Sequence, residues 1–414
     1  MSAEDLGRRL LGEVEEAGLD EVLSSIKALA DSGTSSHFGI PPLDHLLGVF
    51  ERHATSPAAQ RRAPGSPSKN QRSNYSQNFN ARTPAVELTS LGPGAGKTHL
   101  LYLITALAIL PEVHSGIDLQ GHGGTVVFID TDGCFSVERF VQVMQCHIER
   151  RIKQHNNATS FDEARPGRQE ASISETEQRS MICHALDHVH ILQPQSHAAV
   201  LSTLSQLSAY LFDGSAHKSL LRPLQCIILD SAGAFFHPLK AAEEQALLLQ
   251  PPNNVTSSQT TAAAAAAATP PTTSEAYASL VRELRSLQHR FQCAVIATTA
   301  SLSVSKLDAG NAPLPTLRPL LPPAFTSFAT LRLAVTREIV PAFPPAMSVQ
   351  EARRERGQRQ GVVEQGRVRV SVDGWGADGW GRELTESVLG LRDRAAWDLR
   401  ITRDGVILEE DEAS

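Results

Sequence analysis

The sequence predicts an α/β fold, in which a mostly parallel, twisted sheet is flanked by helices and bordered by antiparallel strands at one edge. Between residues 84 and 300, short apolar runs alternate with amphipathic helical segments, which is the pattern of βαβ units. A glycine-rich segment connects one of these runs to the helix that follows it. After Thr326, three further strand-like runs occur without long helices between them, and these predict the antiparallel edge.

The composition is that of a protein able to bury a core. Of the 414 residues, 41% are hydrophobic and 20% are charged. The net charge of −7 means that contact with nucleic acid requires a local basic patch or another subunit. Five widely spaced cysteines without a Cys-x-x-Cys pair indicate reduced thiols. No apolar run approaches the roughly 20 residues of a membrane span, and the charged N-terminus is unlike a signal peptide.

Composition divides the chain into four parts. Residues 1–50 show helical spacing of apolar residues and are expected to form an N-terminal helical segment. Residues 51–83 are polar and rich in Ser, Pro, Asn and Arg, which predicts a disordered insertion. Residues 84–408 are expected to form the main domain, and residues 409–414 an acidic tail. Within the main domain, we expect loose loops at 154–180, 302–325 and 344–365 and a low-complexity, alanine-rich insertion at 241–275.

The expected strands are apolar runs bounded by turn residues. They cover residues 85–90, 125–130, 188–193, 224–230 and 293–298, followed by 329–337, 367–372 and 397–408. The first long helix is an apolar segment that ends at Pro111. Ser136 is expected to cap a second helix, because apolar residues recur at helical spacing from Val137 to Ile152. Further helices are expected at 197–212 and 276–291.

The segment SLGPGAGKT, residues 90–98, follows a strand and opens a helix. In this context, backbone N–H groups of a glycine-rich loop close around phosphate oxygens, and the helix N-terminus adds its positive dipole end. Lys97 is expected to reach the β- and γ-phosphates, and the Thr98 hydroxyl to bind Mg²⁺. The segment therefore predicts a site for a nucleotide such as ATP. The expected nucleotide-binding residues are Gly92, Gly94, Ala95, Gly96, Lys97, Thr98 and His99.

One position of this loop departs from the usual pattern. In the pattern Gly-x-x-x-x-Gly-Lys-[Ser/Thr], the position of the first glycine is occupied here by Leu91. A glycine follows one place later, at Gly92. A left-handed backbone at Leu91 would cost roughly 1–2 kcal/mol, so we expect the start of the loop to adjust instead. A chance match in a glycine-rich turn is the alternative, and the flanking strand and helix argue against it.

Acidic residues end two of the predicted strands. Asp230 ends the run LQCIILD, and Asp130 and Asp132 end the run VVFIDTD. The C-terminal ends of parallel strands meet at the ligand-binding edge of such a sheet. Asp230 is therefore expected to hold Mg²⁺, and Asp130 or Asp132 to polarise an attacking water. A strand-end turn without a catalytic role is the alternative for the latter pair.

These motifs, in this order and spacing, resemble the RecA-type recombinases in their eukaryotic strand-exchange branch, and within it the recombinase paralogues. Besides the phosphate loop, the resembling segments are GIPPLDHLLG at 39–48, IDTDGCFSVERF at 129–140, IILDSAGAFF at 227–236, VIATTA at 295–300 and WDLRITRDGVIL at 397–408. The resemblance implies a RecA-like P-loop ATPase core that binds ATP and Mg²⁺. By position it implies a nucleotide held by Lys97 and Thr98, a metal site at Thr98 and Asp230, and a catalytic carboxylate at Asp132.

The resemblance also implies partners and a cellular role. Recombinase paralogues assemble with one another in hetero-oligomers, reside in the nucleus and act in homologous recombination and double-strand-break repair. DNA, single-stranded or branched, is the expected partner through the complex, and no membrane partner is expected.

Several residues depart from the active members of this family. Asp132 stands where they have glutamate, and a displacement of about 1 Å can cost on the order of 100-fold in rate. Thr299 and Ala300 stand where an Asn-Gln pair couples the nucleotide to DNA. The second expected DNA loop, residues 301–326, carries only Lys306 and Arg318 as cations. The sequence therefore predicts a subunit that assists strand exchange, and it leaves open a weak DNA-dependent ATPase activity.

Three alternatives remain at the level of sequence. The first alternative is a self-assembling DNA-dependent ATPase. The second is an architectural subunit with a non-functional P-loop. A more remote alternative is a small-molecule kinase, for which the arginine-rich run at 353–359 would supply the substrate lid. A solvated or DNA-facing loop explains that run more readily, because it lies between the predicted edge strands.

Overall fold

The computed structural model describes Leu19 and residues 37–54, 83–160, 172–249, 271–304, 314–391 and 395–409. Several predictions lie outside these residues. They are the N-terminal helices ahead of residue 37, most of the insertion at 51–83, the run of alanines and nearly all of the acidic tail.

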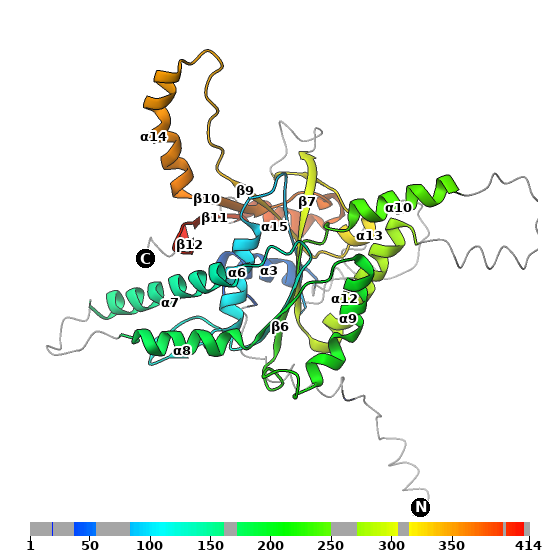
Figure 1. The fold of residues 1–414 in the computed structure, drawn as a ribbon, viewed down its shortest axis with the longest axis horizontal. Helices are drawn as coiled ribbons and strands as arrows, with labels where there is room; N and C mark the ends of the chain where they lie inside the picture. The colour runs from blue at the N-terminus through cyan, green and yellow to red at the C-terminus, as the bar shows by residue number, and fades with distance from the viewer. Residues whose placement is uncertain are drawn as a thin grey trace, which may run out of the picture.

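One mixed sheet organises the described residues (Figure 1). Its strand order is β12-β11-β10-β9-β1-β7-β6-β4-β5, and β8 pairs with β7 outside this path. The strands from β9 to β5 are parallel, whereas β10, β11 and β12 are antiparallel to their neighbours. The predicted α/β fold with an antiparallel edge is confirmed, and it is compatible with a RecA-like core. The parallel strands are β1 (Ala85–Ser90), β4 (Thr125–Asp130), β5 (Val189–Leu192), β6 (Leu224–Asp230), β7 (Ala294–Val304) and β9 (Leu331–Arg337).

The antiparallel pairs complete the set of strands. The edge strands are β10 (Arg367–Val372), β11 (Ala396–Ile401) and β12 (Val406–Leu408), and β8 is Leu317–Pro319. A separate two-stranded sheet consists of β2 (Val113–His114) and β3 (Ile117–Asp118).

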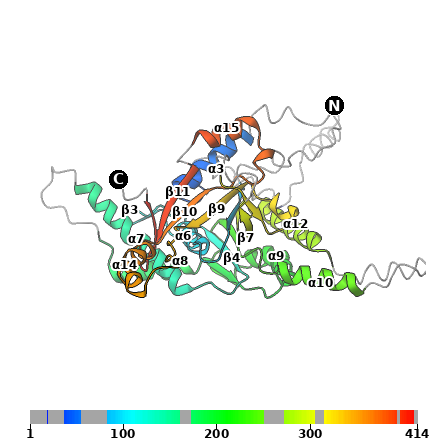
Figure 2. The same cartoon turned by 90° about the horizontal axis from the view of Figure 1, so that it is seen from above.

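Helices cover both faces of the sheet (Figures 1 and 2). One core cluster contains apolar side chains of α3, α6, α7 and α8, and the other contains those of α9 and α12. The helices are α3 (Pro41–Ala54), α6 (Lys97–Ile109), α7 (Val137–Ser160), α8 (Glu175–Leu186), α9 (His197–Phe212), α10 (Phe236–Leu249), α12 (Thr273–Phe291), α13 (Pro323–Thr326), α14 (Val349–Gln365) and α15 (Arg382–Gly390), with a 3-10 turn at Ala377–Gly379. Within the described part of the chain, none of them is long and apolar enough to cross a membrane.

Helix α6 positions the phosphate loop. All its residues from Leu100 to Ile109 are buried. The helix contacts the sheet and α7, which explains why its sequence is apolar on every side. Burial on both sides fixes its first turn, with Lys97 and Thr98, against the ends of the strands.

The predicted loose loop at 344–365 is instead largely helical, because it contains α14. Ser348 begins this helix with a capping box, in which its hydroxyl accepts from the Glu351 N–H at 3.3 Å and its own N–H donates to the Glu351 carboxylate at 3.0 Å. No residue of α14 is buried. The helix therefore lacks the apolar stripe by which a helix is recognised in a sequence.

Other elements extend into segments predicted to be loose. Helix α7 continues to Ser160, and α8 begins at Glu175 after a capping box formed by Ser174 and Glu177. Strand β7 runs on to Val304, and helix α3 reaches Ala54. The start of α8 is set by hydrogen bonds of this capping box rather than by apolar periodicity.

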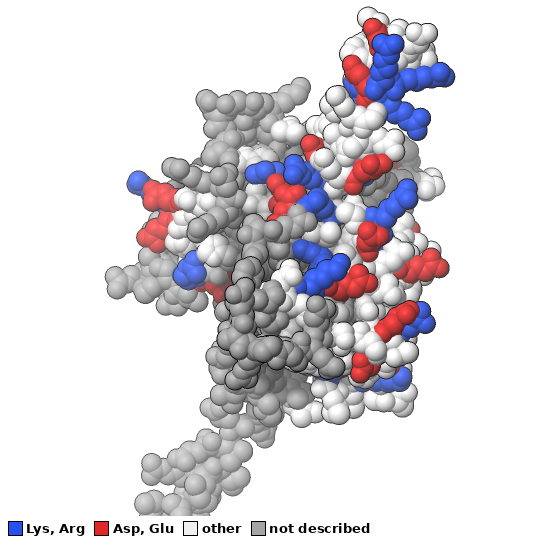
Figure 3. Space-filling view, turned by 90° about the vertical axis from the view of Figure 1, so that its left-hand side faces the viewer, with Lys and Arg blue, Asp and Glu red and all other residues white. Residues whose placement is uncertain are grey.

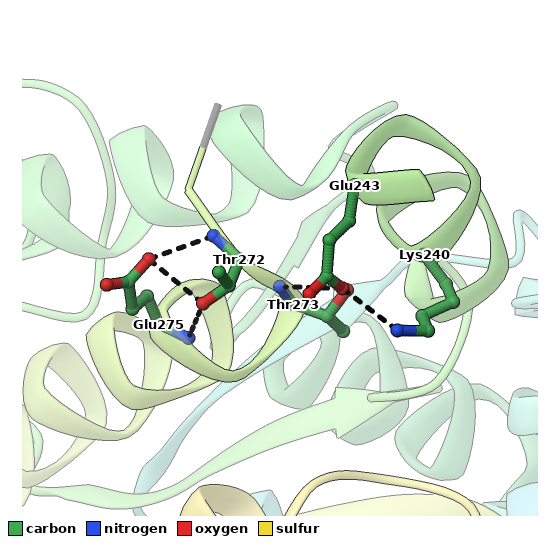
Figure 4. A network of polar contacts seen from close by, with 5 residues as sticks. All are labelled: Lys240, Glu243, Thr272, Thr273 and Glu275. Carbon is green, nitrogen blue, oxygen red and sulfur yellow. Dashed lines mark hydrogen bonds and ion pairs between the residues drawn. The ribbon is translucent and has the colours of Figure 1, made fainter. Parts of the chain in front are cut away.

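A polar network joins the two helices on either side of the low-complexity insertion (Figure 4). The Glu243 carboxylate of α10 accepts from the Thr273 hydroxyl at 2.7 Å and from the Lys240 amine at 3.2 Å. Thr272 and Glu275 form a capping box at the start of α12. Helix α10 buries no residue, and it is joined to α12 by the Glu243–Thr273 bond and by Phe236, whose ring centre lies 6.4 Å from that of Tyr277.

Tyr277 tests the packing on the α12 face of the sheet. Its side chain is fully buried, and its hydroxyl donates to the Ala232 carbonyl at 2.9 Å. Tyr277→Phe leaves that carbonyl without this donor, so we expect the free energy of unfolding in chemical denaturation to fall by about 1–2 kcal/mol. Tyr210→Phe is the control, because the Tyr210 hydroxyl pairs with His190 Nδ1 at 2.9 Å in a less buried position. A loss no larger than in this control would contradict the expectation.

Candidate functional site

The phosphate loop connects the central strand β1 to α6. Gly96 is the N-cap of α6 with φ 105°, and Gly94 has φ 73°. Both angles lie in the left-handed region that favours glycine. No side-chain hydrogen bond caps α6 at Gly96, so its first backbone N–H groups point into the loop as donors.

The two ends of the loop differ in their surroundings. A Cβ on Gly96 would lie 2.7 Å from Ile401 Cδ1 and 3.1 Å from Val368 Cγ2, so this glycine is seated against β10 and β11. A Cβ on Gly92 or Gly94 would meet no atom within 4 Å. The loop is therefore anchored where α6 begins and open where a ligand would approach.

The displaced glycine does not strain the loop. Among the described residues, the non-glycine positions with positive φ are Ser115, Gln120 and Gln292, and Leu91 is not one of them. The Leu91 side chain is 49% exposed. The start of the loop adjusts as predicted, and glycine is not required at Leu91.

Lys97 and Ser90 meet at the base of the loop. The Lys97 amine donates to the Ser90 hydroxyl, which donates to the Gly92 carbonyl at 2.8 Å. Burial lowers the pKa of Lys97, and the carboxylates of Asp230 and Asp132 oppose this shift. Lys97 thus lies within the field of both predicted acidic residues. Sequence reasoning did not identify Ser90 as a partner of the loop.

Asp230 joins the phosphate loop to the neighbouring strands. The Thr98 hydroxyl donates to Asp230 Oδ2 at 2.8 Å, and the Thr298 hydroxyl of β7 donates to Oδ1 at 2.5 Å. The two predicted metal ligands, Thr98 and Asp230, are therefore in direct contact. Thr298 was missed in the sequence, although it is a polar residue near the end of a strand that pairs with β6.

Asp130 and Asp132 have different roles despite their proximity in sequence. Asp130 is buried and accepts from the N–H groups of Cys134 at 3.1 Å and Phe135 at 3.0 Å, and from Gln193 Nε2 at 2.9 Å. It therefore holds the turn after β4. Asp132 is exposed on that turn. Of the two carboxylates, Asp132 is the one left to face a ligand.

The surroundings of Asp132 disfavour its ionised form. Partial burial raises its pKa, the nearby carboxylates of Asp230 and Asp130 raise it further, and Lys97 opposes them. A carboxylate with a raised pKa beside a phosphate loop has the properties of a general base.

His99 and Ala95 complete the predicted nucleotide-binding residues. Ala95 is half-buried and packs against the core. Burial, together with the Arg139 and Arg337 cations, lowers the pKa of His99 to about 4. The imidazole is neutral at neutral pH, so it can hydrogen-bond or stack on a nucleotide but adds no positive charge.

Thr299 belongs to a buried charged group behind the loop. Its hydroxyl donates to Glu87 Oε1 of β1 at 2.6 Å. Arg332 Nε lies 3.4 Å from both Glu87 Oε2 and Asp373 Oδ2. The Thr299 hydroxyl is thus committed to Glu87, whereas Ala300 is exposed.

The residues at this edge of the sheet fit a magnesium nucleotide. The Thr98 hydroxyl and the Asp230 carboxylate are hard oxygen donors of the kind that Mg²⁺ takes. Within the described residues, no group of three or more His, Cys, Asp or Glu side chains could hold a metal ion. Magnesium bound together with phosphates needs only one or two protein ligands, so this donor set is sufficient.

Comparisons with known proteins give a short match. No protein-family model matches the chain. Over 58 residues, the chain is 38% identical to the human (Homo sapiens) DNA repair protein RAD51 homolog 2. The matched stretch covers 14% of this chain and 14% of that protein. The match supports a relationship to the RAD51/RecA family and does not identify a particular paralogue.

The different surroundings of Asp130 and Asp132 predict different effects on stability. Asp130→Ala leaves two backbone N–H groups without their acceptor, so we expect the free energy of unfolding to fall by about 3 kcal/mol. Asp132→Ala is the matched control, and we expect a change of less than about 0.5 kcal/mol. Chemical denaturation of both variants checks this, and equal losses would show that Asp130 does not hold the turn.

Proposed function

We propose that the chain is an ATP-binding subunit of the recombinase-paralogue type, which acts in homologous recombination and double-strand-break repair. One observation carries the proposal. The Thr98 hydroxyl, the Asp230 carboxylate and the Lys97 amine converge at a phosphate loop in which Gly92 and Gly94 are open to a ligand. The relationship to the RAD51/RecA family supports the assignment to recombination and repair.

The nucleotide would be held by the chain's own residues as follows. Backbone N–H groups of the loop and of the first turn of α6 donate to phosphate oxygens, and Lys97 adds a positive charge. Thr98 and Asp230 would hold Mg²⁺, which neutralises charge on the phosphates. His99, neutral at this site, would contact the nucleotide without competing for the metal.

Two features of the site favour retention of ATP over rapid turnover. The carboxylate of Asp132 is one methylene shorter than that of a glutamate, which places its oxygens farther from an attacking water. The Thr299 hydroxyl is committed to Glu87. We propose that the chain assists strand exchange performed by other proteins and that any ATPase activity is weak.

The partners follow from the same proposal. We place the chain in a nuclear hetero-oligomer with other recombinase paralogues, in contact with DNA. Within the family, Asp132 in the catalytic position and the helix segment at 100–111 favour a subunit similar to the X-ray repair cross-complementing group two protein. The short match is to a different paralogue and supports the relationship to the family.

Lys97 tests the nucleotide site. Lys97→Ala removes the positive charge that faces the phosphates, so we expect the affinity for MgATP to fall at least about ten-fold, or ~1.4 kcal/mol. Isothermal titration calorimetry on the purified chain measures it. Lys218→Ala is the control, because Lys218 is an exposed lysine paired with Asp187. Equal affinity of the wild-type chain and Lys97→Ala would refute the site.

Variants of Asp132 test whether its short carboxylate is the reason for slow ATP turnover. Asp132→Glu extends the carboxylate by one methylene, and we expect ATP turnover in the presence of single-stranded DNA to rise by about an order of magnitude. Asp132→Asn should abolish whatever turnover the wild type has. Because the pKa of Asp132 is raised, turnover should decline with falling pH sooner than an ordinary aspartate would predict. Turnover that is the same in all three proteins would eliminate Asp132 as the catalytic carboxylate.

A further inference from the structure

A pocket lies at the edge of the sheet opposite the phosphate loop. Its volume is about 460 Å³, and residues of α8, of the β2–β3 hairpin and of the end of α6 line it. Arg222, which also lines it, precedes the start of β6, whereas Asp230 at the other end of that strand contacts Thr98. Figure 1 shows α8 ending beside the end of α6. The pocket is therefore separate from the nucleotide site, and its size is that of a ligand-binding cleft.

Fixed elements form the walls of this pocket. Arg151 of α7 holds the β2–β3 hairpin, because its guanidinium donates to the carbonyl and to the carboxylate of Asp118, both at 2.8 Å. Met181 and Ala185 of α8, together with Ile109 of α6, are buried and form an apolar wall. The pocket is therefore preformed, as binding pockets usually are.

The guanidinium of Arg222 lies at one end of the pocket without a carboxylate partner. Its contacts are long, 3.3 Å to the Ile109 carbonyl and 3.4 Å to His184 Nε2. Burial lowers the pKa of Arg222, and no neighbouring carboxylate among the described residues opposes this shift. An arginine side chain stays charged in a protein, so most of its N–H groups remain available to an anion.

Half-buried arginines elsewhere have better partners than Arg222. Arg151 and Arg359 each pair with a carboxylate, at 2.8 Å and 2.6 Å, and Arg139 donates to three backbone carbonyls. The surface shown in Figure 3 likewise has positive and negative side chains interspersed. Arg222 combines partial burial with an unbalanced charge. Such a cation is costly unless a ligand supplies the anion.

The other end of the pocket is acidic and already occupied. The Glu177 carboxylate accepts from the Ser174 hydroxyl at 2.7 Å and from the Ser174 N–H at 3.0 Å. These bonds lower the pKa of Glu177, and His114, which also lines the pocket, lowers it further. Glu177 lies two helical turns, or about 10 Å, from His184. An anionic group that enters the pocket is therefore directed to the Arg222 end.

Apolar side chains are exposed next to the lining residues. Leu221, directly before Arg222, is 96% exposed, and Val113, directly before His114, is 55% exposed. Covering such side chains with apolar surface is favourable, and a small anion cannot cover them. These residues favour a protein segment as the source of the anion.

We propose that this pocket binds a segment of a partner protein in which a glutamate or aspartate lies beside apolar residues. The carboxylate accepts from the guanidinium of Arg222, which matches it with two parallel donors. The apolar neighbours of the acidic residue pack on Met181 and Ala185 and cover Leu221. The proposal goes beyond the proposed function and does not depend on the nucleotide.

The test uses two labelled pentapeptides with blocked ends, one with a glutamate between two leucines and one with a glutamine in its place. Fluorescence anisotropy with the full chain measures their affinities. We expect the glutamine peptide to bind at least about ten-fold more weakly, because it lacks the charge that pairs with Arg222. In Arg222→Gln this preference should disappear, whereas the control Arg282→Gln, at an exposed position of α12, should keep it.

A second variant tests the pocket without removing the contact between Arg222 and Ile109. Ser180 is an exposed lining residue of α8, and Ser180→Glu places a negative charge in the pocket. We expect the affinity for the glutamate peptide to fall at least about ten-fold through repulsion between like charges. Ser205→Glu, at an exposed position of α9, is the matched control and should bind as the wild type does.

Four results would overturn the proposal. They are equal affinities of the wild-type chain for the two peptides, no binding of either peptide at about 1 mM, an Arg222→Gln variant that still prefers glutamate, and unchanged binding by Ser180→Glu. Glutarate that displaces the peptide at an equal concentration would assign the pocket to a small carboxylate and would also contradict a protein partner.

Measurements of MgATP affinity separate this proposal from the proposed function. Helix α6 has 13 residues and places Ile109 about 18 Å from Lys97. Arg222→Gln and Ser180→Glu should therefore bind MgATP as the wild type does, and Lys97→Ala should keep the affinity for the glutamate peptide. Loss of peptide binding in a folded Lys97→Ala variant would count against the pocket as the peptide site.

Discussion

The carboxylate of Asp230 is the interaction on which the site depends. It accepts from Thr98 of α6 on one oxygen and from Thr298 of β7 on the other, and its backbone carbonyl accepts from the Thr131 N–H at 2.8 Å. A buried carboxylate without partners is costly, so these three segments must meet at the end of β6. The geometry of the candidate site is therefore set by the same contacts that complete the edge of the sheet.

A second buried charged group lies behind this edge. Burial raises the pKa of both Glu87 and Asp373, while the single Arg332 guanidinium between them opposes the shift. Two carboxylates that share one cation leave excess negative charge unless one of them holds a proton. Because Asp373 also accepts from the Leu317 N–H at 2.9 Å, the group links the strand before the phosphate loop to β8. The Thr299 hydroxyl, which donates to Glu87 Oε1 at 2.6 Å, belongs to the same group.

Most of the sheet and the position of the phosphate loop could be predicted, because they depend on apolar periodicity and on one local motif. Helix α14 could not, because it has no apolar stripe. The distinction between Asp130 and Asp132 also escaped prediction. Both follow the same strand, and only the positions of the Cys134 and Phe135 N–H groups show which carboxylate is occupied. The contact of Gly96 with Ile401 joins residues far apart in sequence, and no local pattern reveals it.

Ile401 also lies against the glycine at the end of α14. The Ile401 side chain leaves no room for a Cβ at Gly96, and its carbonyl leaves none at Gly366, the residue that ends α14. The Ile401 N–H donates to the Gly366 carbonyl at 2.9 Å. The phosphate loop and α14 therefore rest on opposite parts of one residue, each through a glycine.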